Sequence, residues 1–253
     1  MNSMYDVTFQ TEARYKSVKY GQGTIYSSAC GPASLCNALK VLGIASVSLP
    51  TMCKLAVSCG ARVTGGTDMH QLLRAASKKY AFAYRTTSKN AELLAHLKSG
   101  GTAILHAGTE YKLFSTSGHF VCAAAAKGST ITVLDSYWYS SKYTSSAIRR
   151  NYAHVVNKGV VQTSLTQCGK ATIDRAPSYY LLSSPKQDAH PSEQEEPDMT
   201  YYKEFKDIPL YYQDAVKKLL DAGAIAGTGK GLELSEDLCR AFTILDKAGL
   251  LKL

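Results

Sequence analysis

The sequence predicts an α+β fold, in which helices precede an antiparallel sheet, followed by a small all-α module at the C-terminus. Three observations lead to this prediction. Apolar residues recur at helical spacing within residues 33–98, and short β-branched or apolar segments replace that pattern from residue 102 onward. A polar stretch with three prolines then separates these segments from a tail with helical periodicity.

The first clear helix is predicted to begin just after Cys30. Its apolar residues fall at positions i, i+3, i+4 and i+7 and form one stripe: Leu35, Ala38, Leu39 and Leu42. Pro32 suits the first helical turn, where its missing N–H is not needed, and Gly43 suits the end of the helix. Two further helices are predicted over residues 69–79 and 91–98.

Four short strands are predicted after the helices. They cover residues 102–106, 119–125, 130–134 and 179–182, which are mostly apolar or β-branched. Lys127-Gly128-Ser129 supplies a hairpin turn between the second strand and the third. Because most helices come first and the strands follow, the pattern favours helices packed on an antiparallel sheet.

The chain is predicted to divide at an acidic, proline-containing stretch. Residues 185–200 lack apolar periodicity, and prolines and like charges keep such a segment extended, which indicates a linker. It separates a domain of residues 1–184 from a helical module of residues 201–253. Ser235 is a good N-cap for the second helix of this module. The two apolar stripes predicted there are Tyr212, Ala215, Val216, Leu219 and Leu220, and Leu238, Ala241, Phe242, Leu245 and Ala248.

The net charge of +9 is distributed unevenly along the chain of 253 residues. Residues 1–185 carry 20 Lys+Arg and 7 Asp+Glu, a net charge of +13, whereas residues 186–253 carry 9 and 13, a net charge of −4. A basic domain alone permits nucleic-acid binding, but no basic and aromatic recognition motif supports it. The charge is equally suited to a polyanionic cell wall.

Several classes of protein are not expected. There is no apolar run of about 18 residues, so no membrane span is predicted. The segment Met1–Gln10 lacks the basic and apolar regions of a signal peptide, which predicts synthesis in the cytoplasm. The 7 cysteines are an odd number without paired CxxC spacing, which argues against a disulfide scaffold and against a zinc site. No metal or other cofactor is predicted.

Cys30 is the centre of the predicted chemistry. A thiol reacts as the thiolate, and the free N–H groups and positive dipole end of a helix N-terminus favour that form. A base is needed beside it, and His119 opens one predicted strand while Asp135 closes the next. Antiparallel pairing would place these two at one end of the sheet, where Asp135 could orient the imidazole.

The same residues also have plainer interpretations. Cys30 could be a buried structural thiol, and His119 an ordinary residue at a strand end. Asp135 could simply cap the turn that follows it. His106 is the rival base, but no acidic residue follows it at strand spacing.

Three segments together resemble a known family. Tyr26-Ser27-Ser28-Ala29-Cys30-Gly31-Pro32-Ala33-Ser34-Leu35, Gly118-His119-Phe120-Val121 and Val133-Leu134-Asp135 are similar to the papain-fold cysteine peptidases related to bacteriocin-leader-processing (double-glycine) peptidases. The resemblance covers about residues 15–182. It implies a papain-like fold, with Cys30 as nucleophile, His119 as general base and acid, and Asp135 as the orienting residue. It also implies that Gln22, eight residues before the cysteine, supports the oxyanion hole.

The tail carries a second resemblance. Phe205-Lys206-Asp207-Ile208-Pro209, Gly223-Ala224-Ile225-Ala226-Gly227 and Leu232-Glu233-Leu234-Ser235-Glu236-Asp237-Leu238 resemble the short helical module that ends many phage and bacterial peptidoglycan hydrolases, and half of an S-layer homology unit. The resemblance implies that residues 201–253 bind the bacterial cell wall.

These observations predict an endolysin-type peptidoglycan hydrolase that cuts peptide or amide bonds by a Cys-His-Asp mechanism and reaches the wall after holin-type release. Tyr137 and Trp138 are predicted to line its substrate cleft, the alternative being ordinary packing. Three other functions remain open: a muramoyl-peptide amidase, a leader- or protein-processing cysteine peptidase, and a non-catalytic basic protein that binds cell wall or nucleic acid.

Overall fold

The structure is a computed structural model that describes residues 5–185, 201–226, 231–232 and 234–251. The chain divides into two compact units, residues 1–190 and 191–253, which are described separately. The predicted linker of residues 185–200 lies, apart from Pro185, outside the described residues. None of the described helices is long and apolar enough to cross a membrane.

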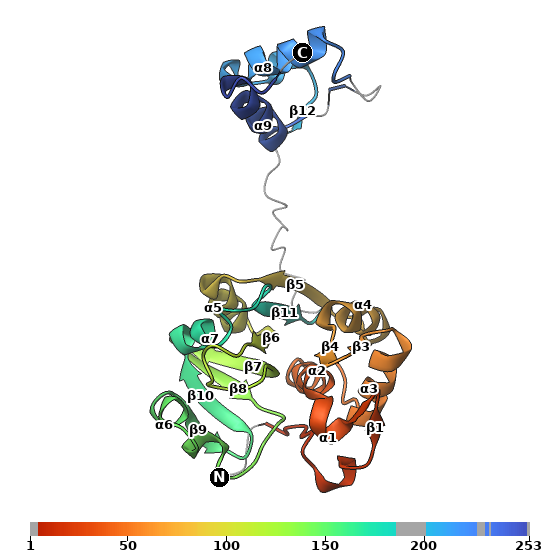
Figure 1. Ribbon diagram of the computed structural model, residues 1–253, viewed down its shortest axis with the longest axis vertical. Helices are drawn as coiled ribbons and strands as arrows, with labels where there is room; N and C mark the ends of the chain where they lie inside the picture. The colour runs from red at the N-terminus through yellow and green to blue at the C-terminus, as the bar shows by residue number, and fades with distance from the viewer. Residues whose placement is uncertain (1–4, 186–200, 227–230, 233, 252–253) are drawn as a thin grey trace. The chain divides into compact units, whose positions relative to one another are not determined.

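The first unit is built on a seven-stranded sheet in which all neighbouring strands are antiparallel (Figure 1). The strand order is β5 (Ala83–Thr87), β11 (Tyr179–Ser183), β6 (Thr102–Ala107), β7 (His119–Lys127), β8 (Thr130–Leu134), β10 (Val160–Ser164) and β9 (His154–Asn157). The four predicted strands are confirmed as β6, β7, β8 and β11, and they form the centre of the sheet. The sequence did not predict β5, β9 and β10.

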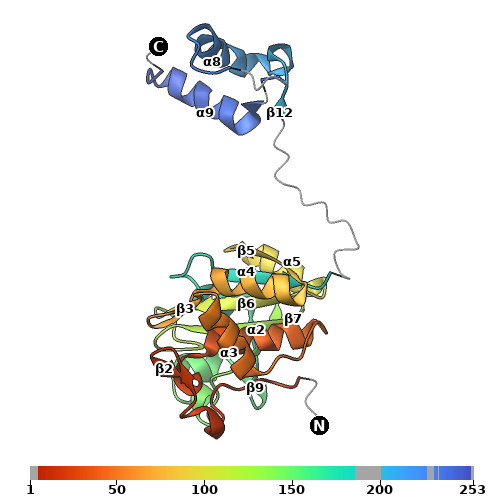
Figure 2. The ribbon, with the colours of Figure 1, turned by 90° about the vertical axis from the view of Figure 1, so that its right-hand side faces the viewer.

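Helices cover both faces of this sheet (Figures 1 and 2). One face carries α1 (Ile25–Ser28), α2 (Cys30–Val41), α3 (Leu49–Ser58) and α4 (Met69–Tyr80). The other carries α5 (Asn90–Lys98), α6 (Ala147–Tyr152) and α7 (Leu165–Ala171). The α+β class and the helices predicted at 33–43, 69–79 and 91–98 are confirmed.

Shorter elements complete the unit. The hairpin of β1 (Lys19–Tyr20) and β2 (Gly23–Thr24) precedes α1, and the hairpin of β3 (Arg62–Val63) and β4 (Gly66–Thr67) precedes α4. Two 3₁₀ helices are η1 (Ala13–Tyr15) and η2 (Lys142–Thr144).

Strand β7 links the two halves of the hydrophobic core. Because successive side chains of a strand point to opposite faces, Phe120 and Cys122 join the cluster that contains α2, whereas Val121 and Ala123 join the cluster that contains α5 and α7. Helix α2 is buried over nine consecutive residues, so its apolar surface is wider than the single predicted stripe. The helix is therefore surrounded along residues 31–39, and it packs against β7.

The described part of the second unit contains two α-helices, a 3₁₀ helix and a short strand pair. Strands β12 (Tyr201–Tyr202) and β13 (Leu234–Ser235) are antiparallel, and they accompany η3 (Phe205–Asp207), α8 (Leu210–Asp221) and α9 (Glu236–Lys247). The Ser235 side chain caps α9 by accepting a hydrogen bond from the Leu238 backbone N–H. The small core contains Tyr202, Ile208, Tyr212, Val216, Leu234 and Cys239.

The apolar face of α9 differs from the predicted one. Leu238 and Leu245, which were expected inside, are 41% and 40% exposed, whereas Cys239 is fully buried. Adjacent residues are separated by about 100° around a helix, so a shift of one residue turns the helix to a different face. The buried stripe of α8 agrees with prediction at Tyr212 and Val216.

Candidate active site

Cys30 is the first residue of α2 and lies directly after the short helix α1. Thr24 caps α1 through its side chain, and the Ala29 N–H bonds back to the Ile25 carbonyl, so the chain enters α2 in a tight turn. Ala29 offers α2 no side-chain cap. The first N–H groups of this helix have no intrahelical acceptor, which leaves donors beside the half-buried Cys30 thiol.

Gly31 permits close packing at this helix start. A Cβ at position 31 would lie 2.9 Å from the Thr67 Cβ atom, closer than real Cβ atoms pack. Thr67 itself is buried in β4 and shares a 3.1 Å hydrogen bond with the Tyr20 hydroxyl. The lack of a side chain at Gly31 therefore lets the β3–β4 hairpin pack directly against the residue that follows Cys30.

His119 is the first residue of β7 and is buried. Gly118 precedes it with a φ of +88°, a left-handed conformation that strains other residues, and this turn directs the imidazole at the strand start. The His119 Nε2 atom lies 2.8 Å from the Asp135 Oδ1 atom. Because an ionised carboxylate only accepts hydrogen bonds, Nε2 is the donor, and Nδ1 is the ring atom left for Cys30.

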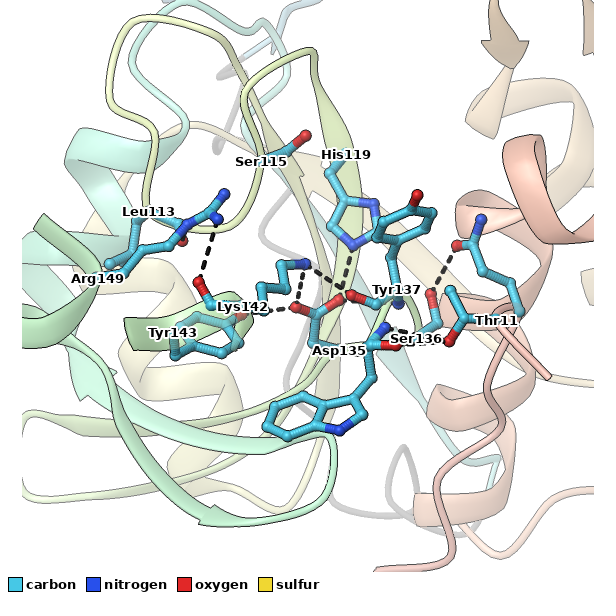
Figure 3. Close-up of polar contacts among 12 residues, drawn as sticks. Thr11, Leu113, Ser115, His119, Asp135, Ser136, Tyr137, Lys142, Tyr143 and Arg149 are labelled. Atoms are coloured by element: carbon cyan, nitrogen blue, oxygen red, sulfur yellow. Dashed lines mark hydrogen bonds and ion pairs between the residues drawn. The ribbon is translucent and has the colours of Figure 1, made fainter. Parts of the chain in front are cut away.

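Asp135 follows β8 and is completely buried, with both carboxylate oxygens used (Figure 3). Oδ1 accepts hydrogen bonds from His119 and from the Tyr137 backbone N–H, the latter at 3.0 Å. Oδ2 accepts from the Lys142 ammonium at 2.5 Å and from the Tyr143 hydroxyl at 2.6 Å. Four donors therefore surround one buried carboxylate and hold it ionised.

The electrostatics of the three residues favour a thiolate–imidazolium pair. Burial opposes ionisation of the Cys30 thiol, but the hydrogen bond and charge of His119, together with backbone N–H groups, outweigh it and lower the pKa. Burial also opposes the charge on His119, but the adjacent Asp135 carboxylate raises the imidazole pKa. The pKa of Asp135 is lowered despite its burial, because Lys142 and His119 are both cationic neighbours.

The other cysteines contrast with Cys30. Burial raises the pKa of Cys36 and of Cys168 to about 12, and it also raises the pKa of Cys53 and Cys122. All seven cysteines are free thiols. Among the described cysteines whose pKa is shifted, only Cys30 is shifted toward the reactive thiolate.

The structure thus brings three predicted residues together and leaves the fourth apart. Gln22 is exposed in the two-residue turn between β1 and β2, and none of the hydrogen bonds described for Cys30, His119 and Asp135 involves its side chain. Its contribution to an oxyanion hole stays a prediction.

Tyr137 and Trp138, the two aromatic residues predicted to line the substrate cleft, have different neighbours. The Tyr137 ring packs edge-on against the His119 imidazole, with ring centres 6.2 Å apart. Trp138 instead stacks on Tyr143, at 6.0 Å, and packs against the core cluster of α5 and α7. Tyr137 is therefore the aromatic residue placed beside the reacting groups, and Trp138 is placed as a packing residue. Substrate contact by either stays a prediction.

His106, the rival base, lies on β6 and pairs with Phe120 of β7. Its ring stacks on the Phe120 ring with centres 4.4 Å apart. Burial and the positive charge of Arg175 lower its pKa to about 4, so it is neutral at physiological pH. No acidic side chain orients it by a hydrogen bond within the described residues.

The sequence did not predict the residues that donate hydrogen bonds to the Asp135 Oδ2 atom. Lys142 and Tyr143 stand in a Ser- and Tyr-rich stretch that has no periodicity and gives no sign of burial. Gln10 was also overlooked: its Oε1 accepts a hydrogen bond from the Ser136 hydroxyl, next to Asp135. A lysine is almost never buried without a charged partner, so only its position in the fold reveals the role.

Within the described residues, no group of three or more His, Cys, Asp or Glu side chains is placed to hold a metal ion. The site can present the Cys30 thiolate beside a protonated His119 imidazole and beside the backbone N–H groups at the start of α2. Such a site is suited to nucleophilic attack on a carbonyl carbon.

No protein-family model and no curated protein matches the chain. Among solved structures, it is similar to a C39-like peptidase from Bacillus anthracis, with a TM-score of 0.46 and 12% sequence identity over 72% of this chain and 95% of that chain. It is also similar to a double-glycine-motif protease from an AMS/PCAT transporter in complex with the leader peptide, with a TM-score of 0.38 and 18% identity over 71% of this chain and 89% of that chain. Neither similarity establishes an activity for this chain.

Proposed function

We propose that the chain is a cysteine peptidase whose catalytic residues are Cys30, His119 and Asp135. The observation that carries the proposal is the buried His119–Asp135 hydrogen bond of 2.8 Å beside a thiol at a helix N-terminus. Residues that are far apart in sequence meet there in the order nucleophile, base and orienting acid that acyl transfer requires.

The reaction follows from the charges of these groups. The Cys30 thiolate attacks the carbonyl carbon, and the negative charge moves to the carbonyl oxygen beside the Cys30 backbone N–H. The His119 imidazolium gives its proton to the leaving amine as the C–N bond breaks, which leaves an acyl-enzyme and a neutral imidazole. His119 then accepts a proton from water, whose oxygen attacks the acyl-enzyme, and the thiolate departs as the imidazolium forms again.

We infer that the substrate is peptidoglycan, with residues 201–253 retaining the enzyme on the cell wall and holin-type release bringing it there. The net charge of +13 on residues 1–185 supports an anionic substrate. Arg175 adds a local reason, because its Nη2 atom lies 3.2 Å from the point where a Cβ of Gly118 would stand, beside His119. The residue is partly exposed, and a peptide carboxylate near the scissile bond would pair with its guanidinium.

The test is the loss of turbidity of purified Gram-positive cell walls, followed with wild type, Cys30→Ala and Cys59→Ala. Cys59 is the matched control, because it is also half-buried but lies outside the site. Lysis by wild type and Cys59→Ala, together with its loss in Cys30→Ala, is expected. Lysis that survives Cys30→Ala would overturn the nucleophile assignment. Mass analysis of the released fragments distinguishes endopeptidase from amidase cleavage.

Absence of lysis by wild type would contradict the wall substrate. Cleavage of unstructured peptides under the same conditions would then favour a leader- or protein-processing peptidase. If neither substrate is cut, the non-catalytic binding alternatives are favoured.

Retention on the wall is tested separately by sedimentation of insoluble walls with the full chain and with a chain that ends at residue 185. The full chain is expected to sediment with the walls to a greater extent. Equal retention of the two would contradict a wall-binding role for residues 201–253.

A further inference from the structure

A buried lysine shares the carboxylate that orients His119. Lys142 is 2% exposed, and its ammonium donates to the Asp135 Oδ2 atom at 2.5 Å and to the Tyr137 carbonyl at 2.9 Å (Figure 3). An unpaired lysine is costly to bury, so this cation is retained against a substantial desolvation penalty. A neutral residue of the same length would fill the space without that penalty.

Lys142 is fixed in place by the backbone around it. Its carbonyl oxygen accepts hydrogen bonds from the Ser145 hydroxyl at 2.7 Å and from Arg149 Nη1 at 3.2 Å. Arg149 is itself buried and donates through Nε to the Leu113 carbonyl at 3.1 Å. The backbone of Lys142 is therefore fixed, and its ammonium can leave Asp135 only by breaking its own buried hydrogen bonds to Asp135 and to the Tyr137 carbonyl.

The buried charges form an alternating row. In the reactive state, the thiolate of Cys30, the imidazolium of His119, the carboxylate of Asp135 and the ammonium of Lys142 follow one another and sum to zero. Without Lys142, Asp135 would lose its second cationic neighbour, and the imidazolium would face two anions that no other cation offsets. It would then hold its proton more tightly, although catalysis requires it to give that proton to the leaving amine.

We propose that Lys142 is a positioning residue that shares the charge of Asp135 with His119, and so keeps the imidazolium acidic enough to protonate the leaving amine. This proposal rests on the proposed peptidase function. Lys142 does not touch the substrate; it acts through Asp135. It also turns Oδ2 away from the imidazole, which leaves Oδ1 as the single acceptor for Nε2.

The other groups around His119 are consistent with this role. The charge of Asp135 raises the pKa of His119, and the charge of Lys142 lowers it, so the two act in opposite directions on one ring. Tyr137 packs on the ring and Tyr143 bonds Oδ2, and both stay neutral because burial raises their pKa. Two other described cations lie in this region: Arg149 donates to carbonyl oxygens, and Arg175 lies beside Gly118.

The structure provides a matched control for the charge. Tyr143→Phe removes a hydrogen bond to the same Oδ2 atom but leaves the ammonium in place. Lys142→Met removes both the hydrogen bond and the charge, and Lys142→Arg keeps a cation. A purely structural role for Lys142 predicts that Lys142→Met and Tyr143→Phe behave alike.

The decisive measurement is the titration of the His119 ring by NMR in a Cys30→Ser background, which needs no substrate. Lys142→Met is expected to raise the His119 pKa by about one unit, as removal of a nearby like charge does. Tyr143→Phe and Lys142→Arg are expected to change it much less. An unchanged His119 titration in a folded Lys142→Met protein would overturn the proposal. If Lys142→Met does not fold, Lys142→Gln is titrated instead and is judged by the same criterion.

The kinetic arm uses the enzyme with Cys30 intact. The alkaline limb of the pH–rate profile is expected to move upward by about one unit in Lys142→Met, as its His119 titration does. A limb that stays in place while the NMR titration shifts would overturn the catalytic part of the proposal. If wild type cuts no peptide, the peptidase function fails, whereas the charge sharing is still decided by the NMR arm.

Discussion

At the residue scale, the chemistry of the site depends on one carboxylate that serves two cations. Asp135 presents Oδ1 to His119 and Oδ2 to Lys142, and its complete burial makes both interactions strong. The pKa of Cys30 is lowered by its contact with His119, and that of His119 is raised by Asp135, so both shifts favour the thiolate–imidazolium pair.

The first prediction concerns the pH dependence of peptide cleavage. The rate is expected to rise with pH as Cys30 loses its proton, at a pH below the ordinary thiol value of 9.0. It is expected to fall again as the imidazolium loses its proton, at a pH above the ordinary value of 6.5. The measurement is the pH dependence of kcat/KM. A bell-shaped profile is expected, with its acidic limb below pH 9.0 and its alkaline limb above pH 6.5. An alkaline limb below pH 6.5 would contradict the ion pair.

The second prediction is that iodoacetamide at neutral pH alkylates Cys30 before the other six cysteines. The thiolate is the reactive form, and burial both covers Cys36, Cys53, Cys122 and Cys168 and raises their pKa. Peptide mapping by mass spectrometry measures the order of modification. His119→Ala should slow the reaction of Cys30 at least tenfold by raising the thiol pKa by about one unit or more. Equal rates in the two proteins would show that the imidazole does not activate the thiol.

The third prediction concerns Asp135→Asn. Loss of the charge that orients His119 is expected to lower kcat by about 10²–10⁴-fold. The change also leaves the Lys142 ammonium buried without its anion, at a cost of about 3–5 kcal/mol in the free energy of unfolding. Denaturant unfolding and steady-state kinetics measure the two effects. The double variant Asp135→Asn/Lys142→Met should regain stability but not activity, and recovery of activity would argue against the role of Asp135.

At the element scale, the site depends on how tightly the start of α2 packs. Pro32 and Gly43 mark this helix in the sequence, and the helix is found at Cys30–Val41. The sequence does not show why Gly31 is needed, because the neighbour that excludes a side chain is Thr67, on a separate hairpin. The edge strands β5 and β9 escaped prediction for a related reason. Their side chains are mostly exposed, so no apolar pattern marks them.

Gly31→Ala provides the test at this scale, with Gly66→Ala as its control. A Cβ at position 31 would lie 2.9 Å from Thr67, whereas a Cβ at position 66, in the same hairpin as Thr67, would meet nothing within 4 Å. Overpacking is expected to destabilise Gly31→Ala by about 1–3 kcal/mol and to displace Cys30, which lowers kcat more than the control does. Thermal unfolding and peptide cleavage measure these effects. Equal behaviour of the two variants would show that the helix start tolerates a side chain.

At the scale of the whole molecule, charge divides the chain. Residues 1–185 carry a net charge of +13 and residues 186–253 a net charge of −4, so attraction to an anionic polymer belongs to the first unit. The acidic module would then bind the wall by hydrogen bonding, stacking or apolar contact instead of charge. Its exposed apolar residues include Leu210, Tyr211 and Ile244.

Salt should therefore slow the lysis of cell walls more than the cleavage of a soluble peptide. Lysis of walls is expected to slow as NaCl rises from about 0.01 to 0.3 M, because the Debye length falls below about 10 Å. Cleavage of a soluble uncharged peptide should change little, because the catalytic charges are buried. Parallel rate measurements over this range make the comparison. Equal salt dependence of the two rates would contradict steering by the basic unit.

The sequence by itself determined the elements that have local signatures: the helix that begins beside Cys30, the strand that His119 opens, and the strand that Asp135 closes. Proline, glycine and apolar spacing act over a few residues, so they can be read along the chain. Only the tertiary structure decided which face of α9 is buried, why Gly31 has no side chain, and that Lys142 shares Asp135 with His119. These outcomes depend on contacts between segments far apart in sequence, where burial converts an ordinary lysine into a fixed charge.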